Sequence, residues 1–364
     1  MRVFQNSGIY PAYLKRLSVL RHGQSGFRAW ISKFLADRYG AAHFLKPILD
    51  GDPNAFFANG DDEAAQRLWA EENGLPSRCS LENILLSQIE SHRTEVFYNL
   101  DPMRYGSDFV RKLPGCVRRS FAWRAAPSPG ADFSAYHGVL CNFPGILKGY
   151  RQQGWRAAYF SPAHDTVMDS YAIRQSRPVD VLFVGGYTRH HRRRAELLEA
   201  VASLPGEFRV DLHLDKSRMT RLAESPLGLL LPIGKHRQPA KIRATAKKPV
   251  FGRDLYEALS RAKIVLNCAI DMAGADRGNM RCFEAMGCGA LMVSDDGNYP
   301  KGIVDGESMV TYHNPVEALE RIRALLKDGA GRQRLAQNGH SLMSTNYSKE
   351  IQWKAFLTIV ESSE

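Results

Sequence analysis

The stretch Val179-Asp-Val-Leu-Phe-Val-Gly-Gly186 decides the fold class of this chain. It is an apolar run that only Asp180 interrupts, and two glycines end it. Such a run is typical of a strand that is buried on both faces of a parallel sheet. Residues 192–204 then carry apolar side chains at helical spacing, and residues 208–214 alternate as a strand does. A strand, a helix and a second strand predict a doubly wound α/β sheet.

The same alternation continues through the second half of the chain. We expect a helix at 255–262, a strand at 264–266, a helix closing at Gly287, a strand at 290–294 and a helix at 319–326. The first half is similar but less regular, with strands expected at 2–6, 95–98 and 138–141 and helices at 13–20 and 81–89. Residues 27–80 carry no pattern that places them. The fold class predicted is α/β, with two Rossmann-like, doubly wound lobes.

The length and composition bound the kind of protein. The chain has 364 residues, of which 44% are hydrophobic and 24% charged. This length exceeds what one hydrophobic core usually supports, so we expect two domains, with a boundary between Pro162 and Pro178. No window approaches the roughly 18 apolar residues of a membrane span, and the N-terminus does not resemble a signal peptide. Six cysteines without a CxxC pair indicate a cytoplasmic protein.

The net charge of +11 makes an anionic partner plausible, such as a nucleotide, a nucleic acid or an anionic membrane face. Both halves of the chain are basic, and neither carries a detached basic tail. No RNA- or DNA-binding signature occurs, so we do not expect a nucleic-acid partner.

The most informative chemistry lies in residues 273–296. A charged, glycine-containing loop opens a short helix at Asn279, and a helix N-terminus after such a loop suits a phosphate. Arg277 and Arg281 could add charge-assisted hydrogen bonds. Glu284 stands in an otherwise apolar helix, where a carboxylate is costly unless it meets a partner such as ribose hydroxyls. The alternative is a solvated glutamate on an ordinary helix that a glycine ends. Periodicity alone leaves both interpretations open.

The order Asn279-x-Arg281-x-Phe283-Glu284-Ala285-x-Gly287-Cys288-Gly289, followed by an apolar strand, resembles the donor-binding signature of group 1 glycosyltransferases. These are family 4-like enzymes of the GT-B fold, and the chain is most similar to their CgeB-related branch. The family carries two acidic residues with seven residues between them, as Asp276 and Glu284 are here, although its first acidic residue is usually Glu. The resemblance implies that Glu284 contacts the ribose and that Arg281 and Asp276 take part in catalysis.

Further segments carry the same resemblance. It implies that Gly185 and Gly186 approach the diphosphate, and that one of Arg189 and Arg192 in the basic run at 189–194 binds phosphate. The segment 251–267, including Arg253, would hold the base, and the diphosphate would rest on the helix that begins at Asn279. The resemblance also implies a donor-binding lobe at 178–346, an acceptor-side lobe at 1–165, and a helix at 347–364 that crosses back to the first lobe, with the two lobes facing a central cleft.

Loops that follow the carboxyl ends of strands face the ligand in such sheets. This singles out Gly8, Asn99 and Asp101 as acceptor-side residues of the first lobe. Asp101 could be a general base, but Asp-Pro is equally a turn signal, so both interpretations stay open. His137 is a further candidate for a sugar contact, although a lone histidine is more often structural.

The sequence therefore predicts a glycosyltransferase that moves a sugar from a nucleotide-diphosphate sugar to a saccharide or lipid-linked acceptor in cell-surface glycan biosynthesis. The resemblance implies a retaining transfer that needs no metal and no cofactor. Basic and apolar residues mix in 14–35, which indicates either a peripheral membrane contact at the inner face or a core helix with a basic outer side. The alternative function is a non-catalytic protein of the same fold that binds a glycan or a nucleotide sugar.

Overall fold

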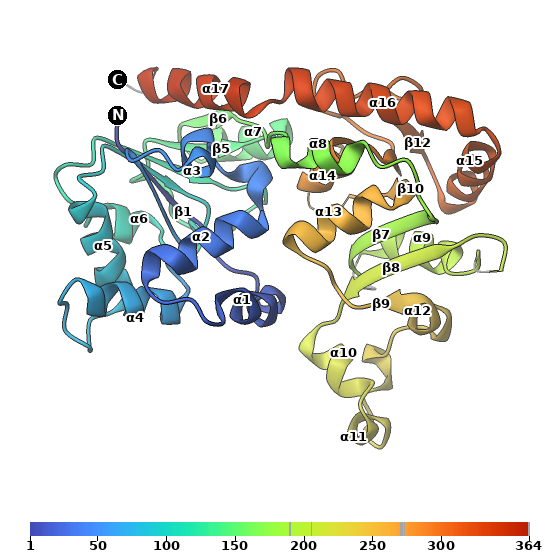
Figure 1. Ribbon diagram of the computed structural model, residues 1–364, viewed down its shortest axis with the longest axis horizontal. Coiled ribbons are helices and arrows are strands. Elements are labelled where there is room, and N and C mark those ends of the chain that lie inside the picture. The colour runs from blue at the N-terminus through green and yellow to red at the C-terminus, as the bar shows by residue number, and fades with distance from the viewer. Residues whose placement is uncertain (189–190, 205, 270–271, 273, 363–364) are drawn as a thin grey trace. The chain divides into compact units, whose positions relative to one another are not determined.

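The computed structural model describes residues 1–188, 191–204, 206–269, 272 and 274–362. Its contacts divide the chain into two compact units, whose elements Figure 1 labels. The first unit consists of Met1–Ala163, Met272–Asp276 and Tyr347–Glu364. The second consists of His164–Asp271 and Arg277–Asn346.

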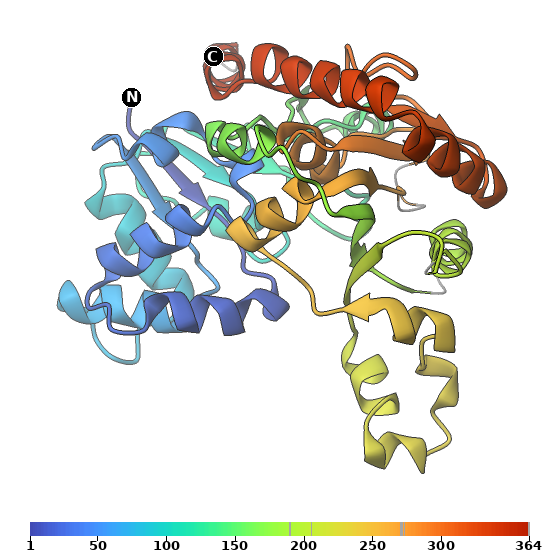
Figure 2. The same cartoon turned by 45° about the vertical axis from the view of Figure 1, so that its right-hand side comes forward.

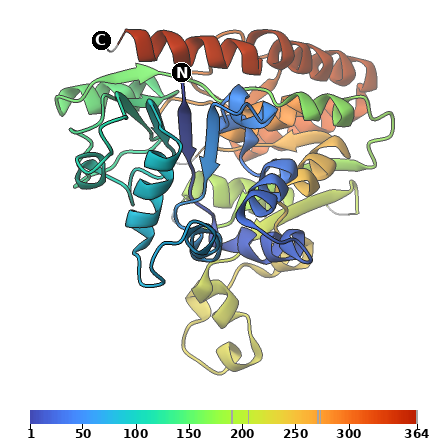
Figure 3. The same cartoon turned by 60° about the vertical axis from the view of Figure 1, so that its left-hand side comes forward.

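The first unit is built on a parallel sheet, which among the described residues has six strands in the order β2-β1-β3-β4-β5-β6. These strands are β1 (Val3–Asn6), β2 (Ala55–Ala58), β3 (Val96–Asn99), β4 (Arg119–Trp123), β5 (Gly138–Cys141) and β6 (Ala157–Tyr159). Every neighbouring pair is parallel, and Figure 3 shows β1 and β2 side by side. Parallel neighbours cannot be joined by tight turns, so helices must connect them across the sheet.

The helices of the first unit include one from the far end of the chain. They are α1 (Leu14–Arg21), α2 (Phe27–Asp37), α3 (Lys46–Asp50), α4 (Glu63–Glu72), α5 (Leu81–Ser91), α6 (Ser107–Val110), α7 (Pro144–Gln152) and α17 (Lys349–Glu361), with short 3-10 turns at Pro11–Tyr13 and Ala41–His43. Ser80 and Asp62 cap α5 and α4 through their side-chain oxygens, which accept the N–H groups of Asn83 and Ala65.

The second unit has the same plan. Its sheet, over the residues that the structure describes, has six parallel strands in the order β12-β11-β10-β7-β8-β9. They are β7 (Val179–Gly186), β8 (Val210–Asp215), β9 (Ala246–Lys247), β10 (Ala262–Leu266), β11 (Leu291–Asp295) and β12 (Val310–Tyr312). The unit's helices are α8 (Asp169–Ala172), α9 (Arg192–Val201), α10 (Arg218–Ala223), α11 (Pro226–Leu229), α12 (Ala240–Thr245), α13 (Gly252–Ser260), α14 (Met280–Gly287), α15 (Pro315–Lys327) and α16 (Gly329–Asn346), with 3-10 turns at Thr166–Met168 and Gly234–His236.

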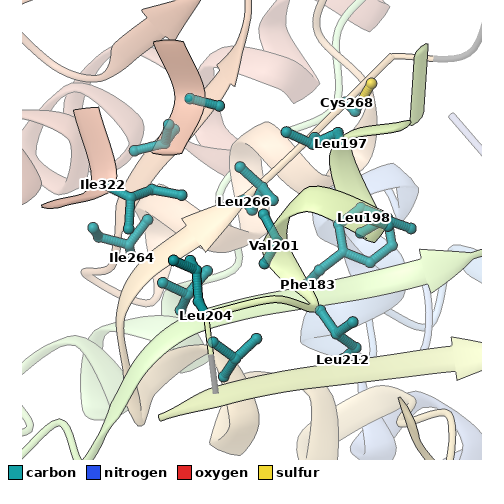
Figure 4. Close-up of a cluster of buried hydrophobic side chains, with 14 of the residues drawn as sticks. Phe183, Leu197, Leu198, Val201, Leu204, Leu212, Ile264, Leu266, Cys268 and Ile322 are labelled. Carbon is teal, nitrogen blue, oxygen red and sulfur yellow. The ribbon is translucent and has the colours of Figure 1, made fainter. Parts of the chain in front are cut away.

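One face of the second sheet is covered by α9 and α15. The apolar side chains of α9, such as Leu197, Leu198 and Val201, interleave with those of β7, β8 and β10, and all are buried (Figure 4). Ile322 on α15 belongs to the same cluster. The helical stripe and the apolar strands that the sequence shows are therefore the two sides of one core.

The predicted elements are confirmed with shifts of one to three residues at most boundaries. The sequence did not reveal β2 or the helices α10–α12, which are too short to display a period. It also did not reveal β4, although this strand is no shorter than β1, β3 and β5. The stretch 14–35 forms α1 and α2 with a break at 22–26, as the core-helix interpretation expects. Its apolar residues Leu17, Phe27 and Phe34 are buried, and Arg16 pairs with Asp37 at 2.6 Å.

Helix α17 packs against the sheet of the first unit through buried aromatic contacts. Phe356 is fully buried, and its ring centroid lies 5.2 Å from that of Tyr98 and 5.9 Å from that of Phe121. Lys349, at the start of the helix, is buried and donates to the carbonyls of Ala41 at 2.7 Å and Phe44 at 2.7 Å. A buried ammonium group is tolerated here because backbone oxygens surround it.

We expect Phe356→Ala to destabilise the first unit by about 3–5 kcal/mol, since it removes a ring from a closed aromatic cluster and leaves a cavity. Urea unfolding followed by intrinsic fluorescence measures the loss. Ile351→Ala on the same helix is the matched control, because Ile351 is exposed and its truncation should cost no more than about 0.5 kcal/mol. Equal effects of the two substitutions would contradict this account of the helix.

Candidate active site

The carboxyl edge of the second sheet gathers loops from three neighbouring strands. Leu266, the last residue of β10, pairs with Phe183 of β7 on one side and Val293 of β11 on the other. The loops that follow these strands therefore begin next to one another. In open α/β sheets this edge is where ligands bind.

A chain of polar side chains holds the start of α14 at this edge. Asn279 donates through Nδ2 to Oδ1 of Asn267 at 3.1 Å, and Nδ2 of Asn267 donates to Oγ of Ser294 at 3.0 Å. The Tyr312 hydroxyl donates to the carbonyl oxygen of Asn267 at 2.8 Å. Asn279 occupies the N-cap position, but its side chain does not cap the helix. The positive end of the helix dipole therefore lies at the edge, and the side chain of the N-cap residue does not cap it.

Glu284 has the partner that its apolar helix requires. Its carboxylate is buried and accepts a hydrogen bond of 2.6 Å from Nη1 of Arg281, one turn earlier. Burial raises the pKa of Glu284, and the charge of Arg281 and its hydrogen bond act in the opposite direction. In the part of the chain that the structure describes, the buried Nε of Arg281 has no hydrogen-bond partner. The pair thus keeps one unused donor at the start of α14.

Arg277, a second candidate for phosphate binding, has a structural role. Its Nε lies 2.9 Å from Oδ2 of Asp295, and Oδ1 of Asp295 accepts the N–H of Ala269 at 2.9 Å. The backbone N–H of Arg277 donates to the carbonyl of Asn298 at 2.8 Å. These contacts hold the loop before α14 against the end of β11.

Within the described part of the basic run, the structure brings Arg194 to this edge. Arg189 lies outside the described residues. The side chain of Arg192 is 88% exposed and pairs with Glu196 at 2.7 Å, so Arg192 is not the member that reaches this edge. Arg194 donates from Nη2 to the carbonyl of Cys268 at 2.6 Å, and its buried Nε has no hydrogen-bond partner within the described chain. Residues two apart on a helix point about 200° apart, which separates the two arginines.

The glycine turn and the start of α13 lie where the sequence placed them. Gly186 ends β7, and a Cβ there would meet no atom of the described residues within 4 Å, so these residues leave space at the strand end. Arg253 is the second residue of α13 and is exposed. Because α13 runs back across the sheet into β10, its amino end also lies at the carboxyl edge.

Asp276 belongs by its contacts to the first unit rather than to the donor side. It is buried, and its Oδ2 accepts the N–H of Gly145 at 2.6 Å, in the first turn of α7. A carboxylate at a helix N-terminus is stabilised by the helix dipole. Asp276 and Glu284, which have seven residues between them, therefore belong to different units.

On the first sheet, Asn99 positions Asp101. Oδ1 of Asn99 accepts Nδ2 of Asn6 at 2.8 Å and the backbone N–H of Asp101 at 2.9 Å, and Asn99 is fully buried. Burial raises the pKa of Asp101, while Arg104, 3.4 Å away, lowers it. A Cβ at Gly8 would lie 3.2 Å from Oδ2 of Asp101, so a glycine keeps this carboxylate accessible.

A second carboxylate at this edge, Asp61, was missed. Its two oxygens accept the N–H of Ile9 at 2.9 Å and 3.1 Å. Burial raises the pKa of Asp61, and the charge of Asp101 raises it further. Asp61 follows β2, a strand that the sequence did not reveal. The signal that could have found it is the Asn59-Gly60-Asp61-Asp62 sequence directly after the short apolar run of β2.

His137 does not lie with the other acceptor-side candidates. It precedes β5 and therefore lies at the amino edge of the first sheet, whereas Gly8, Asn99 and Asp101 follow the carboxyl ends of β1 and β3. Its Nδ1 accepts the N–H of Ser120 at 3.1 Å. The structure gives His137 a role in joining β4 to the start of β5, and it does not bring this residue to the other candidates.

Comparison with known proteins finds one family model that matches. Residues 192–358, somewhat less than half of the chain, match the model of a family described as glycosyl transferase-like. The whole chain is similar to HepE of Anabaena, solved in complex with UDP-glucose, at 13% identity and a TM-score of 0.59, with both chains fully covered. No curated protein matches the chain.

Two further structures share the fold. A glycosyltransferase of Rickettsia africae is 9% identical over all of this chain and 98% of its own, with a TM-score of 0.53. Sucrose-phosphate synthase of Thermosynechococcus elongatus is 12% identical over the same shares, with a TM-score of 0.52. The family match over residues 192–358 and the shared GT-B fold agree with the glycosyltransferase that the sequence predicts.

None of the helices in the described ranges is both long and apolar enough to cross a membrane. No group of three or more His, Cys, Asp or Glu side chains within the described chain is arranged to hold a metal ion.

We expect Glu284→Gln to leave the melting temperature at pH 7 unchanged or higher. Because burial raises the pKa of Glu284, the folded protein binds a proton more readily than the unfolded chain does. This contribution to stability is complete at low pH and is lost as the pH rises through the window above the ordinary value of 4.5. Glutamine removes that loss, and differential scanning fluorimetry between pH 4.5 and 8 measures it.

Glu317→Gln is the matched control for this experiment. The N–H of His313 lowers the pKa of Glu317, so its charged form favours folding and its contribution grows as the pH rises. This substitution should therefore change the pH dependence in the opposite direction. A larger loss of melting temperature at pH 7 for Glu284→Gln than for Glu317→Gln would contradict the assignment.

Proposed function

We propose that this glycosyltransferase moves a sugar from a nucleoside-diphosphate sugar to a saccharide or lipid-linked acceptor in cell-surface glycan assembly. One observation carries the proposal: the buried Arg281–Glu284 pair stands at the amino end of α14, at the carboxyl edge of the second sheet. A site with a helix dipole, an unused arginine donor and a buried carboxylate suits a ligand that joins phosphates to hydroxyl groups. The complex of HepE with UDP-glucose supports this class of donor.

The donor diphosphate would rest on the start of α14. Nε of Arg281 and Nε of Arg194 are the buried donors available to its oxygens, and Gly186 leaves room for it at the end of β7. These groups would stabilise the negative charge that grows on the leaving diphosphate as the glycosidic bond breaks. They would supply this charge without a metal ion.

Glu284 would hold the ribose of the donor. Its carboxylate is oriented by Arg281 and is desolvated, so hydrogen bonds from two ribose hydroxyls would satisfy oxygens that water does not reach. Asn279 fixes the start of the helix, and Arg253 lies at the amino end of α13, where the family holds the base. Thermal shifts with different nucleoside diphosphates and their sugar conjugates identify the base and the sugar.

The acceptor would be bound by the first unit. Asp61 and Asp101 are two partly buried carboxylates at one sheet edge, and each can accept a hydrogen bond from an acceptor hydroxyl. Asp276, held at the N-terminus of α7, is the second acidic residue of the family pattern. We propose that it takes part in a retaining transfer, as the resemblance implies, in a protein of the cytoplasm.

We expect a nucleoside diphosphate to raise the melting temperature of the wild type. A ligand at one hundred times its Kd adds about 2.7 kcal/mol to the free energy of unfolding. UDP, GDP, ADP and dTDP are the probes, and the one that shifts the melting curve names the base. Failure of all four, and of their sugar conjugates, with folded protein would overturn the donor site.

The basic run provides a matched pair for the same assay. Arg194→Ala should weaken binding of the active nucleotide about 10- to 100-fold, since it removes a charge-assisted hydrogen bond of about 1.5–3 kcal/mol. Arg192→Ala, two residues away, should leave the Kd unchanged, because its side chain faces solvent. The reverse order of effects would show that Arg192 is the phosphate ligand.

Asp101→Asn should lower the transfer rate while the nucleotide-induced thermal shift stays that of the wild type. General base catalysis contributes about 100- to 10,000-fold, whereas a carboxylate that only shapes the Asp-Pro turn would contribute little beyond stability. The assay is release of nucleoside diphosphate from the donor over a panel of saccharide and lipid-linked acceptors. Asp108→Asn, an exposed aspartate on α6, is the control, and wild-type rates for Asp101→Asn would reject a catalytic role.

A further inference from the structure

The connection between β8 and β9 is an excursion of short helices. Residues 216–245 form α10, α11, the turn Gly234–His236 and α12 before the chain re-enters the sheet at β9. Figures 1 and 2 show these helices projecting away from the second sheet beyond β9. We call residues 216–248 the β8–β9 excursion.

The excursion is held together by its own contacts. Arg237 donates from Nε to the carbonyl of Ala223 at 3.0 Å and from Nη2 to that of Gly228 at 2.9 Å. Lys216 pairs with Glu224 at 2.7 Å. A Cβ at Gly228 would overlap the backbone of Leu222, so α10 and α11 pack too closely for any other residue there. The excursion therefore has a defined conformation without help from its larger apolar side chains.

Positive charge is concentrated in the excursion. Residues 216–248 contain nine lysines and arginines and one glutamate, which gives a net charge of +8 in a chain whose total is +11. Arg218, Arg221, Lys241, Arg243 and Lys248 are among its exposed side chains. The excursion thus carries a large share of the positive charge of the chain, which attracts anionic partners.

Large apolar side chains are exposed among these charges. Leu230 is 85% exposed and Leu227 is 64% exposed, and Met219, Leu222 and Leu231 are exposed as well. Single exposed leucines are common, but five large apolar side chains within thirteen residues are not the usual surface of a protein in water. The core of the excursion contains Ala223 and Ile242 instead, and both are fully buried.

The positive charge and the exposed apolar side chains together favour one class of partner. Nucleic acid or a soluble polyanion would be attracted by the charge but gains nothing from exposed leucines. A protein partner would bury the leucines but has no general reason to require a charge of +8. A bilayer with anionic headgroups attracts the lysines and arginines and also accepts apolar side chains at its acyl boundary.

We propose that the β8–β9 excursion docks this protein on an anionic lipid surface, with Leu227 and Leu230 entering the headgroup boundary and the basic side chains contacting phosphates. Residues 14–35, where the sequence suggested a membrane contact, bury Leu17, Phe27, Ile31 and Phe34 in the core of the first unit, while Leu14 and Val19 are exposed. Asp215, the residue before the excursion, pairs with Gly186, so the excursion leaves the sheet at the edge that carries the donor site. This placement fits a lipid-linked acceptor, although the docking does not depend on the proposed transfer.

The test is sedimentation of the full chain with vesicles. One set consists of phosphatidylcholine alone and another of phosphatidylcholine with phosphatidylglycerol. We expect binding only to the anionic set, and weaker binding as the salt concentration rises. Leu230→Glu should weaken the binding by about tenfold or more, because it removes an inserting side chain. Arg218→Ala and Arg221→Ala should each weaken it about fivefold.

Val19→Glu is the matched control. Val19 is 70% exposed in the rival stretch 14–35, so the same substitution there should leave vesicle binding unchanged. Melting curves establish that each variant is folded. Absence of binding to anionic vesicles at low salt would overturn the proposal, as would loss of binding with Val19→Glu. Vesicle binding by Leu230→Glu as strong as that of the wild type would also overturn the proposal. It would indicate a site that recognises polyanions by charge alone, to which heparin would bind equally well in the wild type and in the variant.

Discussion

Parallel strands cannot be joined by tight turns, and this constraint organises both units of the protein. Each strand must be followed by a helix that returns across the sheet, so all loops that follow strands meet at one edge. In the second unit this brings together Gly186, Asn267, the start of α14 and Asp295, which lie more than a hundred residues apart at the extremes. The polar network from Asn279 to Ser294 then fixes α14 against that edge.

The buried carboxylate of Glu284 is the costly feature of the donor side. An acidic group in an apolar helix opposes folding at neutral pH, and Arg281 offsets only part of that cost, as the raised pKa of Glu284 shows. A protein can keep such a group when a ligand uses it, since the binding free energy arises partly from groups left incompletely satisfied in the empty state. The unused Nε atoms of Arg281 and Arg194 are of the same kind.

The positive charges of the chain fall into different classes once their surroundings are known. Lys349 and Arg277 are buried and hold backbone or loop segments in place. Arg194 and Arg281 are partly buried with a donor to spare, whereas the cations of the β8–β9 excursion are mostly exposed. The net charge of each half of the chain conceals this difference, because acidic residues elsewhere in the second unit offset the positive charge of the excursion.

Periodicity along the chain determined the alternation of strands and helices, and the order of Arg281, Glu284 and Gly287 carried the resemblance to a donor-binding motif. Both are local: a period needs only a single element, and a motif needs only one helix. The tertiary structure decided that Arg194 rather than Arg192 faces the sheet edge, that Asp276 contacts α7, and that Asp61 stands beside Asp101. It also moved His137 to the opposite edge. These outcomes depend on strand register and helix rotation, where one residue or about 100° reverses the direction of a side chain, and a single sequence does not record either.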